Sequence, residues 1–435
     1  MASTRKAAAY KHVDKVDVHL WGRHVGAVAL DPAYGYYAFA YTEAFRKSGI
    51  EPSPLHMPSA EDRVFLFTDL PPATYKRLPA LLSDALPDDF GNALIDRYMA
   101  DKGLLAAAVT PLDRLAYMSQ RAMGALTFKP ARGPTHKKAT AIELSALVQQ
   151  ARQALAGVID DDEHANAALR SIIEVGTSAG GARAKAVVAW NPLTDEIRAG
   201  QLDAPAGFEQ WLLKFDGMGV DKELGMSQDY GRIEYAYHRM AHAAGIDMTP
   251  CRLLKENGRA HFMTQRFDRG PGAARHHMQT LCALAHLDYK KKGANAYSQL
   301  FATIRALGLP YAAMEEALRR MAFNVMARNC DDHSKNFSFL LVEGQPWQLA
   351  PAYDLTFAHN PKGEWTHQHL MSVNGKFKDF GRDDLLAEAS RFGVGTAREV
   401  LGQVRDAVSR WPQFAAQAEV SAAQVGAIQA QLILL

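Results

Sequence analysis

The sequence has few of the features that mark secreted or membrane-bound proteins. Only three cysteines occur among its 435 residues, and no two of them form a Cys-x-x-Cys pair. Cys251, Cys282 and Cys330 are too scattered for the dense disulfide framework of a small secreted domain. No apolar run approaches the roughly 20 residues needed to span a bilayer, and residues 1–15 are polar and basic rather than a secretory signal. We therefore expect a cytoplasmic protein with no membrane partner.

An excess of charge of either sign is also missing. The chain contains 49 lysines and arginines against 47 aspartates and glutamates, which gives a net charge of +2. Such a balance creates no strong global field for nucleic acid, so DNA contact would require a local basic patch or a partner. The 48% of hydrophobic residues is ordinary for a globular protein, and the length predicts two or three domains.

Hydrophobic periodicity predicts a β-rich first part and a helical last part. Alternating apolar and polar residues predict a hairpin over residues 16–29, and strands are also expected over 186–190 and 211–215. An Asn-Gly dipeptide, a strong two-residue turn signal, joins two further strands over 252–267. Helical periodicity covers residues 111–123, 142–156, 232–244 and 315–328, and one hairpin over 337–350 interrupts the mostly helical sequence after residue 272.

Four segments carry residues that suit phosphoryl transfer, which requires held phosphates, a held metal ion and an oriented hydroxyl. Residues 178–185 combine two glycines with small side chains, so their N–H groups could approach phosphate oxygens, although the same residues also suit a plain turn. Lys214 lies in an apolar strand, where its ammonium either reaches the surface or contacts phosphate. In the second case Glu234, on the next predicted helix, is the candidate ion-pair partner.

The other two segments carry candidate groups for proton and metal binding. Asp331 and Asn336 have the spacing of a kinase catalytic loop, in which the aspartate accepts the hydroxyl proton and the asparagine binds Mg²⁺. Asp354 follows the hairpin over 337–350, which would return its carboxylate to Asn336 and bring two oxygen ligands together. Polar loops and helix caps use the same residue types, so the order of the four segments carries more weight than any one of them.

Five short motifs follow one another along the chain. They are Thr-Ser-Ala-Gly-Gly-Ala-Arg-Ala-Lys at 177–185, Trp-Leu-Leu-Lys-Phe at 211–215, Arg-Phe-Asp-Arg at 266–269, Asp-Asp-His-Ser-Lys-Asn-Phe-Ser at 331–338 and Leu-Ala-Pro-Ala-Tyr-Asp at 349–354. In this order they resemble the motifs of the HipA family of bacterial toxin kinases. The resemblance implies an α+β, two-lobed, protein-kinase-like fold with a β-rich N-terminal lobe and an all-helical C-terminal lobe.

The resemblance also assigns roles to individual residues. Asp331 would be the catalytic base, and Lys214 would contact phosphate. Asn336 and Asp354 would hold Mg²⁺. The residues expected to bind ATP are Ala179, Gly180, Gly181, Ala182, Arg183, Lys185, Lys214, Gln265, Phe267 and Asp268.

Within that set, Gln265 and Phe267 would bind adenine through their main chains, and Asp268 would lie near the ribose. Ser178 matches the loop serine that family members autophosphorylate, which ejects the loop and switches the enzyme off. Two residues depart from the family pattern: Gln265 stands where many members have glutamate, and Asp332 replaces a common glycine.

Motifs and periodicity together predict three regions. Residues 1–130 form a β-rich N-terminal subdomain of the HipA type. Residues 131–272 form the rest of the N-terminal lobe, with the glycine-bearing loop and the ATP-binding strands. Residues 273–435 form a helical C-terminal lobe with the catalytic loop and the metal-binding hairpin.

The function implied is that of a serine/threonine protein kinase, the toxin of a toxin–antitoxin system. Its protein substrate would be a translation component such as an aminoacyl-tRNA synthetase, and its partner a small helix-turn-helix antitoxin that supplies most of the DNA contact. Two alternatives stay open: a small-molecule phosphotransferase, and a catalytically inactive binding or co-repressor protein of the same fold.

Weaker features are interpreted as surface. The pairs His276–His277 and His367–His369 are expected to be surface histidines rather than metal ligands, because neither has a third ligand. Residues 290–292, three consecutive lysines, are expected in a solvated loop, with contact to an acidic substrate or partner as the alternative.

Overall fold

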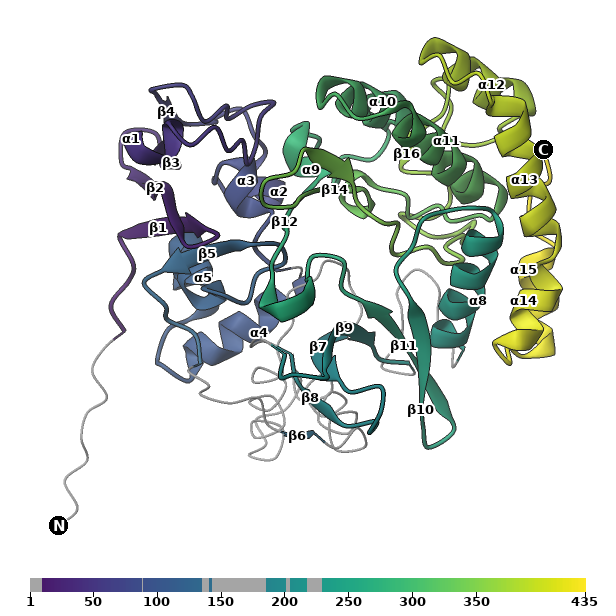
Figure 1. Cartoon of the computed structure of the whole chain (residues 1–435), viewed down its shortest axis with the longest axis horizontal. Helices are drawn as coiled ribbons and strands as arrows, with labels where there is room; N and C mark the ends of the chain where they lie inside the picture. Colours follow the sequence, from purple (N-terminus) through teal and green to yellow (C-terminus); the bar gives the residue numbers. More distant parts are fainter. Residues whose placement is uncertain (1–9, 88, 135–140, 143–184, 201–203, 217–228) are drawn as a thin grey trace. The chain divides into compact units, whose positions relative to one another are not determined.

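A computed structural model describes residues 10–87, 89–134, 141–142, 185–200, 204–216 and 229–435 (Figure 1). The chain divides into two compact units, Met1–Glu51 with Ser59–Gln210, and Pro52–Pro58 with Trp211–Leu435. The division between Gln210 and Trp211 falls inside the second of the three regions expected from the sequence. Helices and strands occur in both units, so the α+β class is confirmed. No helix in the described ranges is long and apolar enough to cross a membrane.

An antiparallel sheet forms the start of the first unit. Its strands are β1 (Lys15–Leu20), β2 (Arg23–Asp31), β3 (Tyr36–Tyr41), β4 (Val64–Phe65) and β5 (Leu126–Lys129), in the order β4-β3-β2-β1-β5. Trp21 and Gly22 connect β1 to β2 with φ of 50° and 77°, the left-handed conformation of a two-residue hairpin turn. The hairpin expected at residues 16–29 is therefore confirmed.

Short helices and a second group of strands complete the first unit. The helices are α1 (Glu43–Arg46), α2 (Pro72–Tyr75), α3 (Ala80–Ser83), α4 (Asp89–Ala100), the 3₁₀ helix η1 (Ala106–Ala108) and α5 (Pro111–Met118). A capping box between Thr110 and Asp113 begins α5, since each side chain satisfies the other residue's backbone N–H. The strands β7 (Lys185–Trp190), β8 (Ile197–Ala199) and β6 (Ala141–Ile142) pair antiparallel in that order.

The second unit begins with an antiparallel group of three strands and one long helix. The elements are β9 (Glu209–Lys214), α8 (Tyr230–Ala243), β10 (Cys251–Glu256) and β11 (Arg259–Gln265), and β11 lies between β9 and β10. Asn257 and Gly258 join β10 to β11 with φ of 44° and 79°, as the sequence predicts for this turn. Helix α8 lies beside β10 and β11 (Figure 1).

The remaining chain is mostly helical and contains the hairpin expected over 337–350. It is therefore not the all-helical lobe that the family resemblance implied. The helices are α9 (Leu281–Leu284), α10 (Tyr297–Ala306), α11 (Tyr311–Met326), α12 (Arg382–Arg391), α13 (Ala397–Ser409), α14 (Trp411–Gln417) and α15 (Ala422–Gln429), with the 3₁₀ turns η2 (Pro271–Ala273) and η3 (Ser334–Asn336). Strands β12 (His277–Thr280), β14 (Ser338–Leu341) and β15 (Trp347–Leu349) form one sheet, and β13 (Asn295–Ala296) pairs in parallel with β16 (Met371–Ser372). The strand β14 is short and fully buried, so its backbone N–H and C=O groups need hydrogen-bond partners within the protein. The strands β12 and β15 supply these partners, one on each side.

Candidate active site

Lys214 lies at the end of β9 and binds two carboxylates. Its Nζ donates to Glu234 on α8 and, at 2.5 Å, to Oδ1 of Asp354. The Lys214 side chain is 13% exposed, and Glu234 is 3% exposed, so the pair is largely removed from water. Buried charges require such partners because an unpaired one is costly to desolvate. The Lys214–Glu234 contact expected from the sequence is present.

Helix α8 packs closely on β11, and this packing brings Glu234 into contact with Lys214. A Cβ added at Gly231 would lie 2.0 Å from the carbonyl oxygen of Ala260, so only glycine fits at this approach. Glu234 follows three residues later, on the same face of the helix. The small residue in the first turn of α8 therefore sets the distance between Glu234 and β9.

The charges around Lys214 fix its protonation. Burial by itself would lower the pKa of Lys214, but the carboxylates of Asp354 and Glu234 outweigh burial and raise that pKa well above its usual range. One ammonium between two carboxylates leaves the cluster with a net charge of about −1. A cluster of this sign attracts a cation.

The loop that follows α11 carries Asp331 and Asn336. Nδ2 of Asn336 donates to the carbonyl oxygen of Asp331 at 2.7 Å, which closes the loop on itself. This bond uses the amide nitrogen and leaves the amide oxygen of Asn336 as the group that suits a metal ion. The Asp331 side chain is 49% exposed and lies 3.8 Å from Nε2 of His333. Asp331 is thus accessible to the hydroxyl of a second molecule.

Tyr353 joins the loop of Asp331 to the segment of Asp354. Its hydroxyl donates to the carbonyl oxygen of Lys335 at 2.6 Å and lies 2.6 Å from Oγ of Ser338. Its ring lies 5.7 Å from the ring of Phe267, just after β11. The next residue, Asp354, has φ of 54°, a left-handed conformation that is unusual for an aspartate and turns its carboxylate toward Lys214.

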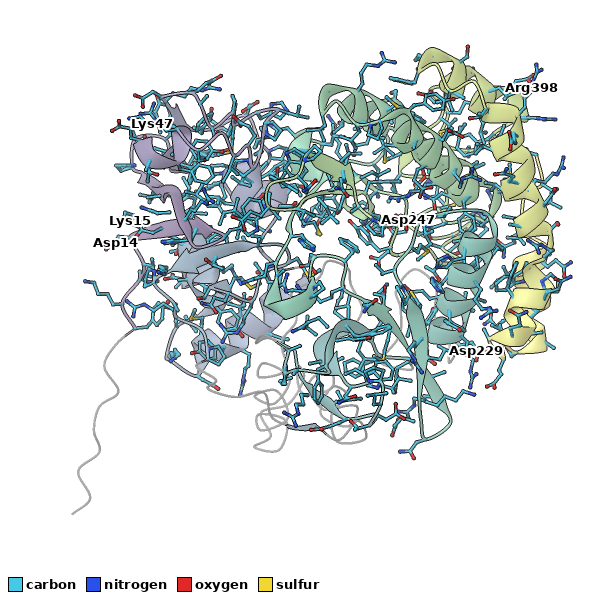
Figure 2. The ribbon with its side chains drawn as sticks, viewed as in Figure 1. Asp14, Lys15, Lys47, Asp229, Asp247 and Arg398 are labelled. Carbon is cyan, nitrogen blue, oxygen red and sulfur yellow. The ribbon has the colours of Figure 1, made fainter. Side chains whose placement is uncertain are left out.

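The turn after α8 holds the same segment from another side. The backbone N–H of Ala352 donates to the carbonyl oxygen of Asp247 at 2.7 Å; Asp247 is labelled in Figure 2. In addition, Nδ2 of Asn329 lies 3.4 Å from the carbonyl oxygen of Asp354. The β9 lysine, the α8 glutamate and the Asp331 loop therefore converge on Asp354. Asp354 thus contacts Lys214 and Asn329, while its approach to Asn336, expected from the sequence, stays a prediction.

The residues expected to contact adenine and ribose are engaged within the protein. Gln265 donates its N–H to the carbonyl oxygen of Pro250 at 2.9 Å, and its carbonyl oxygen accepts from Oγ1 of Thr249 at 2.8 Å. Asp268 is fully buried and binds Arg266 at 2.7 and 2.9 Å and Arg269 at 2.7 Å. A ribose would compete with two guanidinium groups for the carboxylate of Asp268.

Several expected residues belong to other parts of the chain. Lys185 begins β7 in the first unit and is 2% exposed. The other members of the glycine-bearing loop lie outside the described residues; they are Ser178, Ala179, Gly180, Gly181, Ala182, Arg183 and Ala184. The helix expected at 142–156 lies outside them too, except for Ile142, which belongs to the strand β6. The assignment of the loop residues to phosphate binding stays a prediction.

Two histidines expected at the surface are buried, so those predictions were wrong. His277 is 0% exposed because β12 pairs with β14, and its Nε2 lies 2.8 Å from the carbonyl oxygen of Pro52. His369 is also 0% exposed and binds Asp332. His367 is exposed as expected, and residues 290–292 lie in turns, where Lys292 binds Glu364 at 2.7 Å.

The oxygen groups of Asp354 and Asn336 are of the kind that binds Mg²⁺. Within the described ranges no group of three or more His, Cys, Asp or Glu side chains is placed to hold a metal ion. Asp354 and Asn336 would offer one carboxylate and one amide oxygen. Mg²⁺ commonly takes only one or two carboxylates from protein and completes its shell with water and substrate phosphates. Phosphoryl transfer uses an exposed carboxylate, a buried lysine and oxygen groups that can bind Mg²⁺, and residues of these kinds occur here.

Comparison with known proteins agrees with this fold. The HipA N-terminal domain model matches residues 16–129, and the HipA-like C-terminal domain model matches residues 177–411. The HipA of Shewanella oneidensis MR-1, solved with HipB and operator DNA, is 18% identical and superposes with a TM-score of 0.68 over 96% of this chain and 95% of that one. The chain belongs to the HipA family.

A curated relative matches a shorter part of the chain. The putative kinase Y4mE of Sinorhizobium fredii is 30% identical over 126 residues. That match covers 27% of this chain and 30% of Y4mE. The likeness to Y4mE is therefore local, and it extends over well under half of either protein.

Proposed function

We propose that the chain is an ATP-dependent kinase that phosphorylates serine or threonine of a protein. The observation that carries the proposal is the convergence of Lys214, Glu234 and Asp354 beside the loop of Asp331. Among the acidic side chains of this site, that of Asp331 is the most exposed, at 49% against 3% for Glu234 and 26% for Asp354. Membership of the HipA family and the likeness to a protein named as a kinase support the same activity.

The residues divide the work of phosphoryl transfer among them. ATP and Mg²⁺, when bound, would supply the phosphoryl group and neutralise its charge. Asn336 and Asp354 would hold the ion, and Lys214, steadied by Glu234, would contact the phosphates. Asp331 would accept the proton of the substrate hydroxyl. The oxygen of that hydroxyl would bond to the γ-phosphorus as the bond to ADP breaks and ADP leaves. The exposure of Asp331 favours a hydroxyl on a protein surface over a small molecule enclosed in a pocket.

We also propose a toxin role with a DNA-binding partner. The structural neighbour from Shewanella was solved with HipB and operator DNA, which supports a small helix-turn-helix antitoxin for this chain as well. With a net charge of +2, this chain has little excess charge to attract DNA, so the antitoxin would supply most phosphate contacts. Salt-sensitive, sequence-specific DNA binding by the purified chain alone would contradict this division of labour.

Autophosphorylation of Ser178 is proposed as the off-switch. A phosphate on Ser178 adds roughly −1.5 to −2 charges at neutral pH and would repel the phosphates of ATP. A Ser178→Asp variant should therefore bind ATP more weakly than the unchanged chain. Equal ATP affinity and equal kinase activity in the two proteins would exclude the switch.

The activity is tested by label transfer from γ-labelled ATP to protein in the presence of Mg²⁺. Asp331→Ala and Asp354→Ala should each abolish transfer while the proteins stay folded, because positioning and charge supply most of the catalysis. Asp406→Asn, which changes a carboxylate that is 69% exposed on α13, is the matched control and should keep full activity. Full activity in a well-folded Asp331→Ala protein would refute the mechanism.

A further inference from the structure

Asp332, the residue after Asp331, points into the protein instead of toward solvent. It is fully buried, and both of its carboxylate oxygens accept hydrogen bonds. Oδ2 accepts from the hydroxyl of Tyr297 at 2.7 Å and from Nδ1 of His369 at 2.8 Å. Oδ1 accepts from the backbone N–H of Leu370 at 2.8 Å. The carboxylate thus attaches the Asp331 loop to the start of α10 and to the segment before β16.

His369 gives this attachment the character of an ion pair. Its side chain is 1% exposed, and its ring packs edge-on against Phe380 at 5.2 Å. Burial by itself would lower the pKa of His369, but Asp332, with a contribution from Cys330, raises that pKa to about 10. This shift favours the protonated imidazole at neutral pH. Charge-assisted hydrogen bonds of this kind are stronger and more directional than neutral ones.

The contacts of Asp332 continue to the backbone of Asp354. The hydroxyl of Tyr297 accepts from Nδ2 of Asn324 at 3.0 Å. Oδ1 of Asn324 accepts from Nδ2 of Asn329 at 2.9 Å, and that same nitrogen lies 3.4 Å from the carbonyl oxygen of Asp354. Tyr297, Asn324 and Asn329 are all at most 2% exposed. A continuous buried network therefore links the neighbour of Asp331 to Asp354.

We propose that Asp332 and His369 form a positioning pair that fixes the backbone of Asp331 against that of Asp354. The pair is buried, so it touches neither ATP nor substrate and acts only through the two site residues. The inference rests on the proposed kinase function. It adds a specific cause for the geometry of the site: a charged anchor holds one side of the Asp331 loop while the Asp331 carboxylate faces the other way.

The test compares Asp332→Asn with a matched buried carboxylate elsewhere. Asp113, in the first unit, is also fully buried and is contacted by the same kinds of groups: Tyr10 hydroxyl at 3.2 Å, His12 Nδ1 at 2.7 Å and a backbone N–H at 3.0 Å. Both variants, Asp332→Asn and Asp113→Asn, remove a charge and keep the side-chain size. Kinase rates are measured on folded protein, with the folded fraction taken from thermal unfolding curves.

Asp332→Asn should lower kcat by about 10- to 100-fold, the loss expected when a catalytic group is displaced by about 1 Å. Its KM for ATP should change by less than about threefold, because Lys214 and the end of β11 are untouched. Asp113→Asn should keep the wild-type kcat per folded molecule. A purely structural role for Asp332 predicts the same small effect from both variants, and that result would overturn the inference.

The pairing itself is tested by His369→Gln and by the double variant. Residues that act as one unit are not additive, so the double variant should lose no more kcat than the worse single variant. Additive losses would show that the two residues do not act together. If Asp332→Asn does not fold, His369→Gln replaces it in the comparison with Asp113→Asn. A wild-type chain without phosphotransfer would refute the proposed function, whereas an active wild type with an equally active Asp332→Asn would refute this inference alone.

Discussion

At the scale of single residues, the site depends on a lysine between two carboxylates. Lys214 binds Glu234 and Asp354, and both contacts are largely shielded from water. The first contact could be predicted from the sequence, because a lysine in an apolar strand and a glutamate on the next helix are typical of kinases. The second could not, because Asp354 lies 140 residues away and its left-handed backbone gives no signal in the sequence.

Glu234→Gln tests whether the ion pair matters for turnover. The change keeps the size of the side chain but removes the charge that steadies Lys214, so kcat should fall by about 10-fold or more. Glu388→Gln is the control, since Glu388 is 1% exposed on α12 and binds Asn374 and Arg391 away from Lys214. Equal kcat values for the two variants in steady-state assays would show that Glu234 has only a structural role.

The buried histidine makes stability depend on pH in a defined direction. The pKa of His369 is raised from 6.5 to about 10 in the folded state, because Asp332 outweighs the effect of burial. A raised pKa contributes stability that is fully present below pH 6.5 and is lost as the pH rises from 6.5 toward about 10. The unfolding free energy of the wild type, from urea titrations, should therefore fall relative to that of His369→Gln over this window. Parallel curves for the two proteins would contradict the assignment.

At the scale of elements, turns and helices can be predicted from the local sequence more readily than the short strands after residue 272. The hairpins closed by Trp21-Gly22 and Asn257-Gly258 need left-handed turn residues, and the sequence indicates them through Gly22 in the first turn and through Asn257 and Gly258 in the second. The strands β12, β13 and β16 have only two to four residues and form because distant partners are available. Such short strands carry no periodicity of their own, so only the hairpin over 337–350 was expected among the helices after residue 272, and the strand β12 that buries His277 was not.

The first turn of α8 offers a test of how elements set the site. Gly231→Ala places a methyl group 2.0 Å from the carbonyl oxygen of Ala260, so α8 must move away from β11. We expect a destabilisation of about 1–3 kcal/mol and a lower kcat, because Glu234 moves with the helix. In contrast, Gly402→Ala in α13 meets no atom within 4 Å and should stabilise the protein by up to about 1 kcal/mol. Urea titration checks both values, and an unchanged Gly231→Ala protein would disprove the close-packing argument.

At the scale of the whole molecule, the described site belongs to one compact unit. Lys214, Glu234, Asp331 and Asp354 all lie in the unit that contains Trp211–Leu435. Five motifs in order were enough to indicate the family, because they are short, local and independent of packing. The Asp332–His369 pair could not be predicted, because it joins residues 37 positions apart and one of them was interpreted as a surface histidine. The order of the motifs therefore indicated the candidate site residues, whereas the contacts that hold these residues in place could be found only in the structure.

We propose that Asp331 is the catalytic base of a kinase that acts on serine or threonine of proteins. Quantitative phosphoproteomics of cells that express the wild-type chain or Asp331→Ala tests this claim most directly. A small set of serine or threonine sites should gain phosphate only in the cells that express the wild type. Identical phosphorylation in the two cultures, with both proteins folded and equally abundant, would contradict it.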